Sequence, residues 1–127
     1  MTDQLFDHDR LDVYRLSIQY VALAFETANS LHGIHRHARD QWVRAAQSIP
    51  LNVAEGNGKR SRKDRARFLD ISRGSALECT AIQDVLVVSR GISEETNAEL
   101  KSLLLRIVAM LTRMAMKFDS GAESPTE

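Results

Sequence analysis

Six positively charged side chains lie within nine residues in the middle of the chain, with a single acidic residue, Asp64, among them. The six are Lys59, Arg60, Arg62, Lys63, Arg65 and Arg67. Phosphate oxygens accept hydrogen bonds from such side chains and from the unpaired N–H groups at the start of a helix. The run therefore predicts a surface that binds RNA or DNA through backbone phosphates, with Arg36, Arg39 and Arg44 as extensions of it.

The 127 residues carry no net charge, because 17 Lys and Arg balance 17 Asp and Glu, yet the two signs are segregated. Residues 36–73 contain ten basic and four acidic side chains, whereas both flanks are acidic. A local positive field attracts phosphate even on a neutral molecule. The alternative is a solvated surface, or one that pairs with the acidic flanks of a neighbouring subunit or with another acidic protein.

Other residues capable of chemistry have weaker contexts. His32, His35 and His37 lie in a polar stretch beside Gly33, where metal binding is the alternative to a solvated loop. Cys79, the single cysteine, falls on an apolar helix face and is predicted to be a small core residue. We therefore predict no catalytic residue, no metal and no cofactor, and hence a protein that is not an enzyme.

The segments that carry these residues follow helical periodicity almost everywhere. We predict helices over about residues 9–31, 61–90 and 93–118, and a further helix that Gly56 and Gly58 end. Asp9, Ser61 and Ser93 are the predicted N-caps. Short connections favour antiparallel neighbours, so the predicted fold is all-α, an up-down-up-down four-helix bundle over residues 1–118 with a disordered tail at 119–127.

Each predicted helix has an apolar stripe that should form its core seam. The four stripes are Leu11, Tyr14, Ile18, Val21, Phe25 and Ala28; Trp42, Ala46, Ile49, Val53 and Gly56; Phe68, Ile71, Ser75, Cys79, Ile82 and Leu86; and Leu100, Leu104, Ile107, Leu111, Met114 and Phe118. The first helix carries a second stripe, which a monomer would not need. We interpret this stripe as a homo-oligomer interface, and it consists of Val13, Leu16, Tyr20 and Leu23.

Pro50 interrupts the second helix, because it has no N–H and its ring collides with the carbonyl of Ala46. The sequence therefore predicts a helix that bends at Pro50, or that ends and restarts there, with Asn52 and Glu55 near the freed backbone groups. Across the bundle, Glu55 and Glu78 are predicted to form a buried polar layer beside Ser75 that fixes the register of the helices. A metal site or an acid/base pair is the alternative for the two carboxylates.

Composition excludes other classes of protein. No run of about 18 apolar residues is present to span a bilayer. The acidic start MTDQLFDHDR lacks the pattern of a signal peptide, and a single cysteine cannot form an internal disulfide. We therefore expect a cytoplasmic protein without a membrane partner.

Three motifs together carry a resemblance to a known family. The run Ser48-Ile49-Pro50-Leu51-Asn52-Val53-Ala54-Glu55-Gly56, the pair Phe68-Leu69 with Gly74-Ser75-Ala76-Leu77-Glu78, and the opening Leu11-Asp12-Val13-Tyr14 resemble the four-helix-bundle proteins encoded in intervening sequences of bacterial large-subunit rRNA. The resemblance covers roughly residues 6–118, and Leu51 departs from the family's usual small residue. It implies a ring-shaped homopentamer. A related accessory protein of diversity-generating retroelements binds nucleic acid and a reverse transcriptase.

The combined expectation is a non-catalytic, homo-oligomeric bundle that binds RNA or DNA and scaffolds a partner enzyme such as a reverse transcriptase. The alternative is a structural or protein-interaction module whose basic run contacts an acidic protein surface and binds no nucleic acid. Salt-dependent binding to nucleic acid separates the two.

Overall fold

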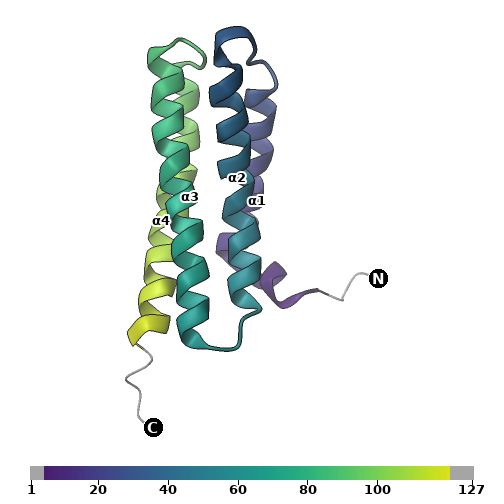
Figure 1. Ribbon diagram of the computed structural model, residues 1–127, viewed down its shortest axis with the longest axis vertical. Helices are drawn as coiled ribbons and strands as arrows, with labels where there is room; N and C mark the ends of the chain where they lie inside the picture. Colours follow the sequence, from purple (N-terminus) through teal and green to yellow (C-terminus); the bar gives the residue numbers. More distant parts are fainter. Residues whose placement is uncertain (1–4, 121–127) are drawn as a thin grey trace.

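Four antiparallel helices make up nearly all of the computed structural model, which describes residues 5–120 (Figure 1). They are α1 (Asp12–Ala28), α2 (Arg36–Asn57), α3 (Arg62–Val88) and α4 (Glu94–Ser120). Two short 3-10 helices, η1 (Asp7–Arg10) and η2 (Gly33–His35), precede α1 and α2. The predicted all-α, up-down-up-down bundle is confirmed. None of the described helices is both long and apolar enough to cross a membrane.

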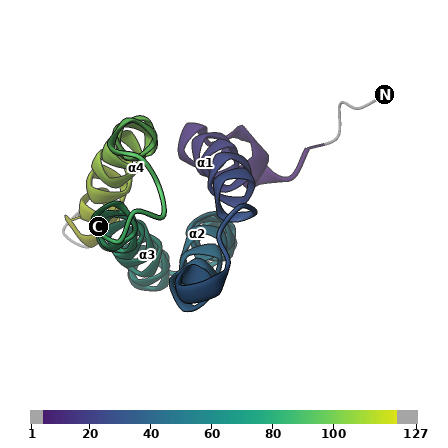
Figure 2. The same ribbon diagram turned by 90° about the horizontal axis from the view of Figure 1, so that it is seen from above.

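The helices follow one another around the bundle, so that α1 lies diagonally opposite α3 (Figure 2). The seams predicted for α2 and α4 form the core as expected. Trp42, Ile49 and Val53 of α2 have no exposed surface, and neither do Leu104 and Leu111 of α4. Pro50 is buried within α2, and the helix continues on both sides of it, so it neither ends nor restarts there.

The role of the two stripes of α1 differs from the sequence prediction. Val13, Leu16 and Tyr20, predicted to form a subunit interface, are 2%, 7% and 0% exposed and belong to the core of the single chain. The predicted core residues Ile18 and Phe25 are instead 45% and 39% exposed. Both stripes are apolar at helical spacing, so periodicity alone cannot choose between them. The observed orientation of α1 lets the Tyr20 hydroxyl accept a hydrogen bond from Trp42 and donate one to Gln83, both inside the bundle.

The remaining member of the predicted interface, Leu23, is 38% exposed. The first half of α3 is also rotated relative to the prediction, because its core face contains Ala66, Leu69, Ser72 and Ala76. Ile71, predicted to be in the core, is 42% exposed. Small residues on this face let α3 lie close to α2, which a count of large apolar side chains does not reveal.

Helix ends agree with the prediction at two of three caps. Ser61 and Ser93 accept hydrogen bonds at 3.0 Å from the backbone N–H of Asp64 and Thr96, as predicted. Asp9 does not cap α1, because it lies in η1 and Leu11 occupies the N-cap position. α4 continues through Ser120, so the predicted disordered tail is wrong for residues 119–120, and its remainder, 121–127, lies outside the described residues.

Two glycines in the bundle provide a matched test of helix packing. A Cβ at Gly56 of α2 would lie 2.9 Å from the Cβ of Phe68 on α3, whereas a Cβ at Gly74 of α3 would meet nothing within 4 Å. Gly56→Ala should therefore force the helices apart and cost about 1–3 kcal/mol of unfolding free energy. Gly74→Ala should stabilise the protein by up to about 1 kcal/mol, because it removes only the flexibility of glycine.

Urea denaturation followed by circular dichroism measures both changes. Equal stability of the two variants would contradict the close approach of α2 and α3 at Gly56.

Candidate nucleic-acid interface

The basic run lies at one end of the bundle, where α2 ends, the α2–α3 loop turns and α3 begins. We call the surface made by its six cations the basic end: Lys59, Arg60, Arg62, Lys63, Arg65 and Arg67. The last turn of α4 packs against it, because Arg62 and Arg65 of α3 both contact Phe118. The fold therefore gathers consecutive residues of the sequence into one surface and supports them with a distant helix.

Two aromatic rings support four of these cations. The Lys59 ammonium and the Arg67 guanidinium lie 5.0 and 4.5 Å from the ring centre of Phe68. The guanidiniums of Arg62 and Arg65 lie 5.2 and 5.5 Å from that of Phe118. Such contacts attract a cation to the face of the ring and hold its position. The sequence shows no aromatic interleaving in the run, and Phe118 reaches it only through the tertiary fold.

Backbone carbonyls hold two of the arginines further. Arg62 donates from Nη2 to the carbonyl of Lys117 at 3.0 Å, and Arg65 donates from Nε to the carbonyl of Lys59 at 2.7 Å. The Lys117 carbonyl belongs to the last turn of α4, where the helix dipole is negative and favours a cation. This contact offsets the unfavourable position of Arg62 at the start of α3.

Arg60 and Lys63 differ from the other four cations. Both side chains are exposed, and within residues 5–120 neither makes a hydrogen bond, an ion pair or a ring contact. Lys59, by contrast, pairs with Glu55 at 3.1 Å. Arg60 and Lys63 are therefore the members of the basic end most available to an external anion.

The three predicted extensions do not join the basic end into one surface. α2 has 22 residues and so is about 33 Å long, and Arg36 and Arg39 lie at its far end. Arg39 is engaged there, since it donates to the Leu31 carbonyl and to Asp40, both at 3.0 Å. Arg44 lies midway along α2 and lines a groove with Ser75 and Glu78 of α3. The three arginines therefore lie along α2, apart from the basic end, and a role for them in binding nucleic acid stays a prediction.

The predicted buried layer of Glu55 and Glu78 is also wrong, since both side chains are exposed. The polar contact between α2 and α3 is made by smaller residues. The Ser75 hydroxyl donates to Ser48 Oγ at 2.8 Å, and Asn52 donates from Nδ2 to the carbonyl and hydroxyl of Ser48 at 2.8 and 2.9 Å. Beside Pro50, the buried Ser72 hydroxyl donates to the Ile49 carbonyl at 2.8 Å. A hydroxyl and a side-chain amide donate to backbone carbonyls here without burying a charge.

The buried polar layer that the structure does contain was missed in the sequence. Trp42 donates from Nε1 to the Tyr20 hydroxyl at 2.9 Å, Tyr20 donates to the side-chain oxygen of Gln83, and Gln83 donates to Asn97 at 2.8 Å. This series of hydrogen bonds connects all four helices, and Tyr20 and Gln83 are fully buried. The one available signal was Gln83, a polar residue in the phase of the apolar seam of α3.

Burial and charge shift three pKa values in and beside this layer. Desolvation raises the pKa of Tyr20, so its hydroxyl stays protonated and donates. Desolvation also raises the pKa of Cys79 to about 12, although a hydrogen bond with Tyr20 opposes the rise. At the surface, hydrogen bonds from Lys101 and Asn97 lower the pKa of Asp84. None of these groups is poised to exchange a proton near neutral pH.

The histidines do not form a metal site, and within residues 5–120 no three His, Cys, Asp or Glu side chains are arranged to hold a metal ion. His35 instead contacts the α3–α4 turn, with Nε2 2.9 Å from the Ser89 carbonyl. Gly91 makes room for this ring, since a Cβ there would lie 3.1 Å from His35 Cδ2. His35 therefore ties together two connections at the end of the bundle opposite the basic end.

Cys79 should resist thiol reagents in the folded protein, because it is fully buried and its pKa is raised. At mildly alkaline pH, we expect labelling by a chromogenic disulfide reagent to proceed only as fast as the protein unfolds, and to be complete at once in denaturant. Rapid stoichiometric labelling of the native protein would show that the thiol is accessible.

Comparisons with known proteins agree with this fold. Residues 9–113 match the family model described as 23S rRNA-intervening sequence protein. The chain is similar to a solved structure from Bacteroides thetaiotaomicron, described as a protein of unknown function from the S23 ribosomal protein family. The two are 19% identical with a TM-score of 0.73, and the match covers 81% of this chain and 97% of that one. No curated protein matches the chain. The bundle is thus shared with that structure, and the family match over most of the described residues shows that this chain belongs to the 23S rRNA-intervening sequence protein family.

Proposed function

We propose that this protein is a non-catalytic homo-oligomer that binds RNA or DNA through phosphates at the basic end. The observation that carries the proposal is the exposure of Arg60 and Lys63, which have no partner in the described part of the chain although four neighbouring cations are held in place. A phosphate beside Lys63 would also lie at the N-terminus of α3, where the helix dipole favours an anion.

The geometry of the basic end favours backbone contacts over base recognition. Phe68 and Phe118 are half-buried and already covered by cations, so they are not open platforms on which bases could stack. Arg and Lys contacts to phosphate give affinity without sequence preference. We therefore expect little discrimination between sequences and a strong dependence on salt.

Oligomerisation would repeat the basic end around the assembly and add weak contacts through avidity. We infer that the interface uses the outer stripe of α1, in which Ile18 and Phe25 are exposed and Tyr14 and Val21 are half-buried. The family resemblance suggests a ring of five copies, which could also scaffold a partner protein. This outer stripe takes the place of the predicted interface stripe, whose residues Val13, Leu16 and Tyr20 are buried in the core.

Replacing Arg60 and Lys63 by Glu should abolish nucleic-acid binding at moderate salt while leaving helicity intact, because neither side chain makes a hydrogen bond, an ion pair or a ring contact within residues 5–120. For the wild type, the logarithm of affinity for duplex DNA should fall with the logarithm of salt by about 0.9 for each phosphate contact. Fluorescence anisotropy with RNA and DNA duplexes over a range of salt measures both effects.

The matched control is Arg36→Glu with Arg44→Glu, which makes the same change of charge at exposed residues away from the basic end. It should retain most of the affinity. If the wild type shows no salt-sensitive binding to RNA or DNA, the basic end is a protein-facing surface and the protein is an interaction module.

Replacing Ile18 and Phe25 by Glu should dissociate the oligomer without unfolding the subunit, because these side chains are 45% and 39% exposed within one chain. Burying the new charges at a contact between subunits would cost several kcal/mol. Light scattering gives the mass of the assembly. A control variant with Leu105→Glu and Met116→Glu, two exposed residues of α4, should keep the mass of the wild-type assembly. A monomeric wild type, or dissociation of the control alone, would contradict the interface on α1.

A further inference from the structure

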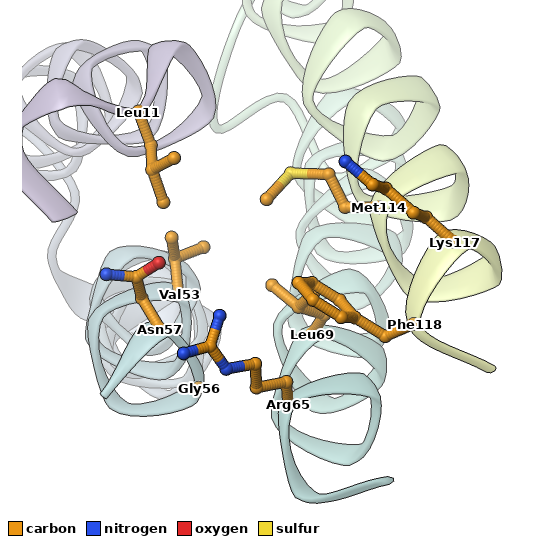
Figure 3. Close-up of a pocket in the computed structure, with 9 residues that line it drawn as sticks. All are labelled: Leu11, Val53, Gly56, Asn57, Arg65, Leu69, Met114, Lys117 and Phe118. Atoms are coloured by element: carbon orange, nitrogen blue, oxygen red, sulfur yellow. The ribbon is translucent and has the colours of Figure 1, made fainter. Parts of the chain in front are cut away.

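A cavity of about 180 Å³ opens beside the basic end, where the ends of all four helices meet (Figure 3). Helices α2, α3 and α4 and the residue that precedes α1 contribute to its wall. The lining residues are Leu11 just before α1; Val53, Gly56 and Asn57 of α2; Arg65 and Leu69 of α3; and Met114, Lys117 and Phe118 of α4. Of the six cations of the basic end, Arg65 lines the cavity, whereas Arg60 and Lys63, which carry the phosphate contacts proposed above, do not.

The wall of the cavity is divided into an apolar interior and a polar rim. Figure 3 shows the side chains of Leu11, Val53, Met114 and Phe118 pointing toward a common space. Val53 and Leu69 are 0% and 2% exposed and so lie deepest. The three polar lining residues are half-buried or exposed, which places them at the rim, and they are Asn57, Arg65 and Lys117.

The size and the apolar lining of the interior determine which apolar group of a ligand can bind there. An apolar cavity of about 150 Å³ stays dry and accepts a molecule such as benzene. The present cavity, at about 180 Å³, is larger and therefore has room for a medium-length alkyl chain or one aromatic ring. A nucleobase fits poorly, because the donors and acceptors of its edges would be buried against Val53, Leu69 and Met114 without partners.

The rim selects the ligand's head group. Arg65 uses Nε to bind the Lys59 carbonyl, and its two terminal nitrogens make no hydrogen bond within residues 5–120. They can donate to both oxygens of a carboxylate. Asp7, which accepts a hydrogen bond from Asn57 at 3.0 Å, is an acidic neighbour of this rim. Among the described residues that line the cavity none is acidic, so Arg65 gives the rim a preference for an anion.

We propose that this cavity binds a medium-chain carboxylate, with the alkyl chain between Val53, Leu69 and Met114 and the carboxylate on Arg65. The aromatic ring of Phe118 lines the part of the cavity that the ligand's alkyl chain would occupy, and it also contacts the Arg65 guanidinium, 5.5 Å from the ring centre. The apolar interior and the cationic rim thus meet at one residue. The proposal is independent of nucleic-acid binding.

Octanoate is the probe, and the methyl signals of isotope-labelled methionine in the full chain report its position. Met114 lines the cavity, whereas Met116, on the same helix, is 62% exposed. Titration should shift the Met114 signal saturably and leave Met116 unchanged. No Met114 shift, or equal shifts at both residues as expected for adsorption to the surface, would overturn the proposal.

Two variants separate the two halves of the site. Arg65→Met should weaken the binding of octanoate roughly tenfold, which is the loss expected for one charge-assisted interaction. The affinity for 1-octanol, which has no carboxylate, should stay unchanged. Leu11→Trp, at a half-buried position that precedes α1, should fill the cavity and abolish the Met114 shift with both probes. Equal octanoate affinity in wild type and Arg65→Met would overturn the carboxylate assignment. The variant with Arg60→Glu and Lys63→Glu should keep octanoate binding, which distinguishes this site from the proposed nucleic-acid surface.

Discussion

The close approach of α2 and α3 at Gly56 is the constraint on which the basic end depends. A side chain at this position would collide with Phe68, so only glycine lets the two helices meet where the α2–α3 loop begins. The approach places Phe68 under Lys59 and Arg67. It also makes Gly56 part of the wall of the cavity that Arg65 borders. Loop, cations and cavity therefore share one packing contact.

The basic end shows how a fold stabilises a concentration of like charge. Six cations in nine residues repel one another, and three of them lie in the first turn and a half of α3, where the helix dipole is unfavourable. Two aromatic rings and the last turn of α4 compensate for part of this cost. Arg60 and Lys63 keep no such compensation within the described chain. This division between supported and unsupported cations is what makes the surface a candidate for an external anion.

The buried polar chain from Trp42 through Tyr20 and Gln83 to Asn97 has a different consequence. Each member satisfies the next, so the core contains polar groups without leaving them unpaired. Because these groups come from all four helices, rotating any one helix would break the chain. The layer thereby specifies which face of α1 points inward. Cys79 is buried beside Tyr20, and its raised pKa follows from the same burial.

The sequence by itself determined the four helices, the caps at Ser61 and Ser93, the core seams of α2 and α4, and the gathering of the basic run at one loop. These features are local, since each follows from residues within a few turns of one another. The tertiary structure alone decided which stripe of α1 is buried, because Val13, Leu16 and Tyr20 are as periodic as Tyr14, Ile18 and Phe25. It also decided the exposure of Glu55 and Glu78 and the contact of Phe118 with Arg62 and Arg65. Those outcomes depend on the rotation of each helix about its axis. That rotation is set by partners far away in the sequence, such as the pairs Tyr20–Trp42 and Tyr20–Gln83, which are 22 and 63 residues apart, so a local pattern cannot predict it.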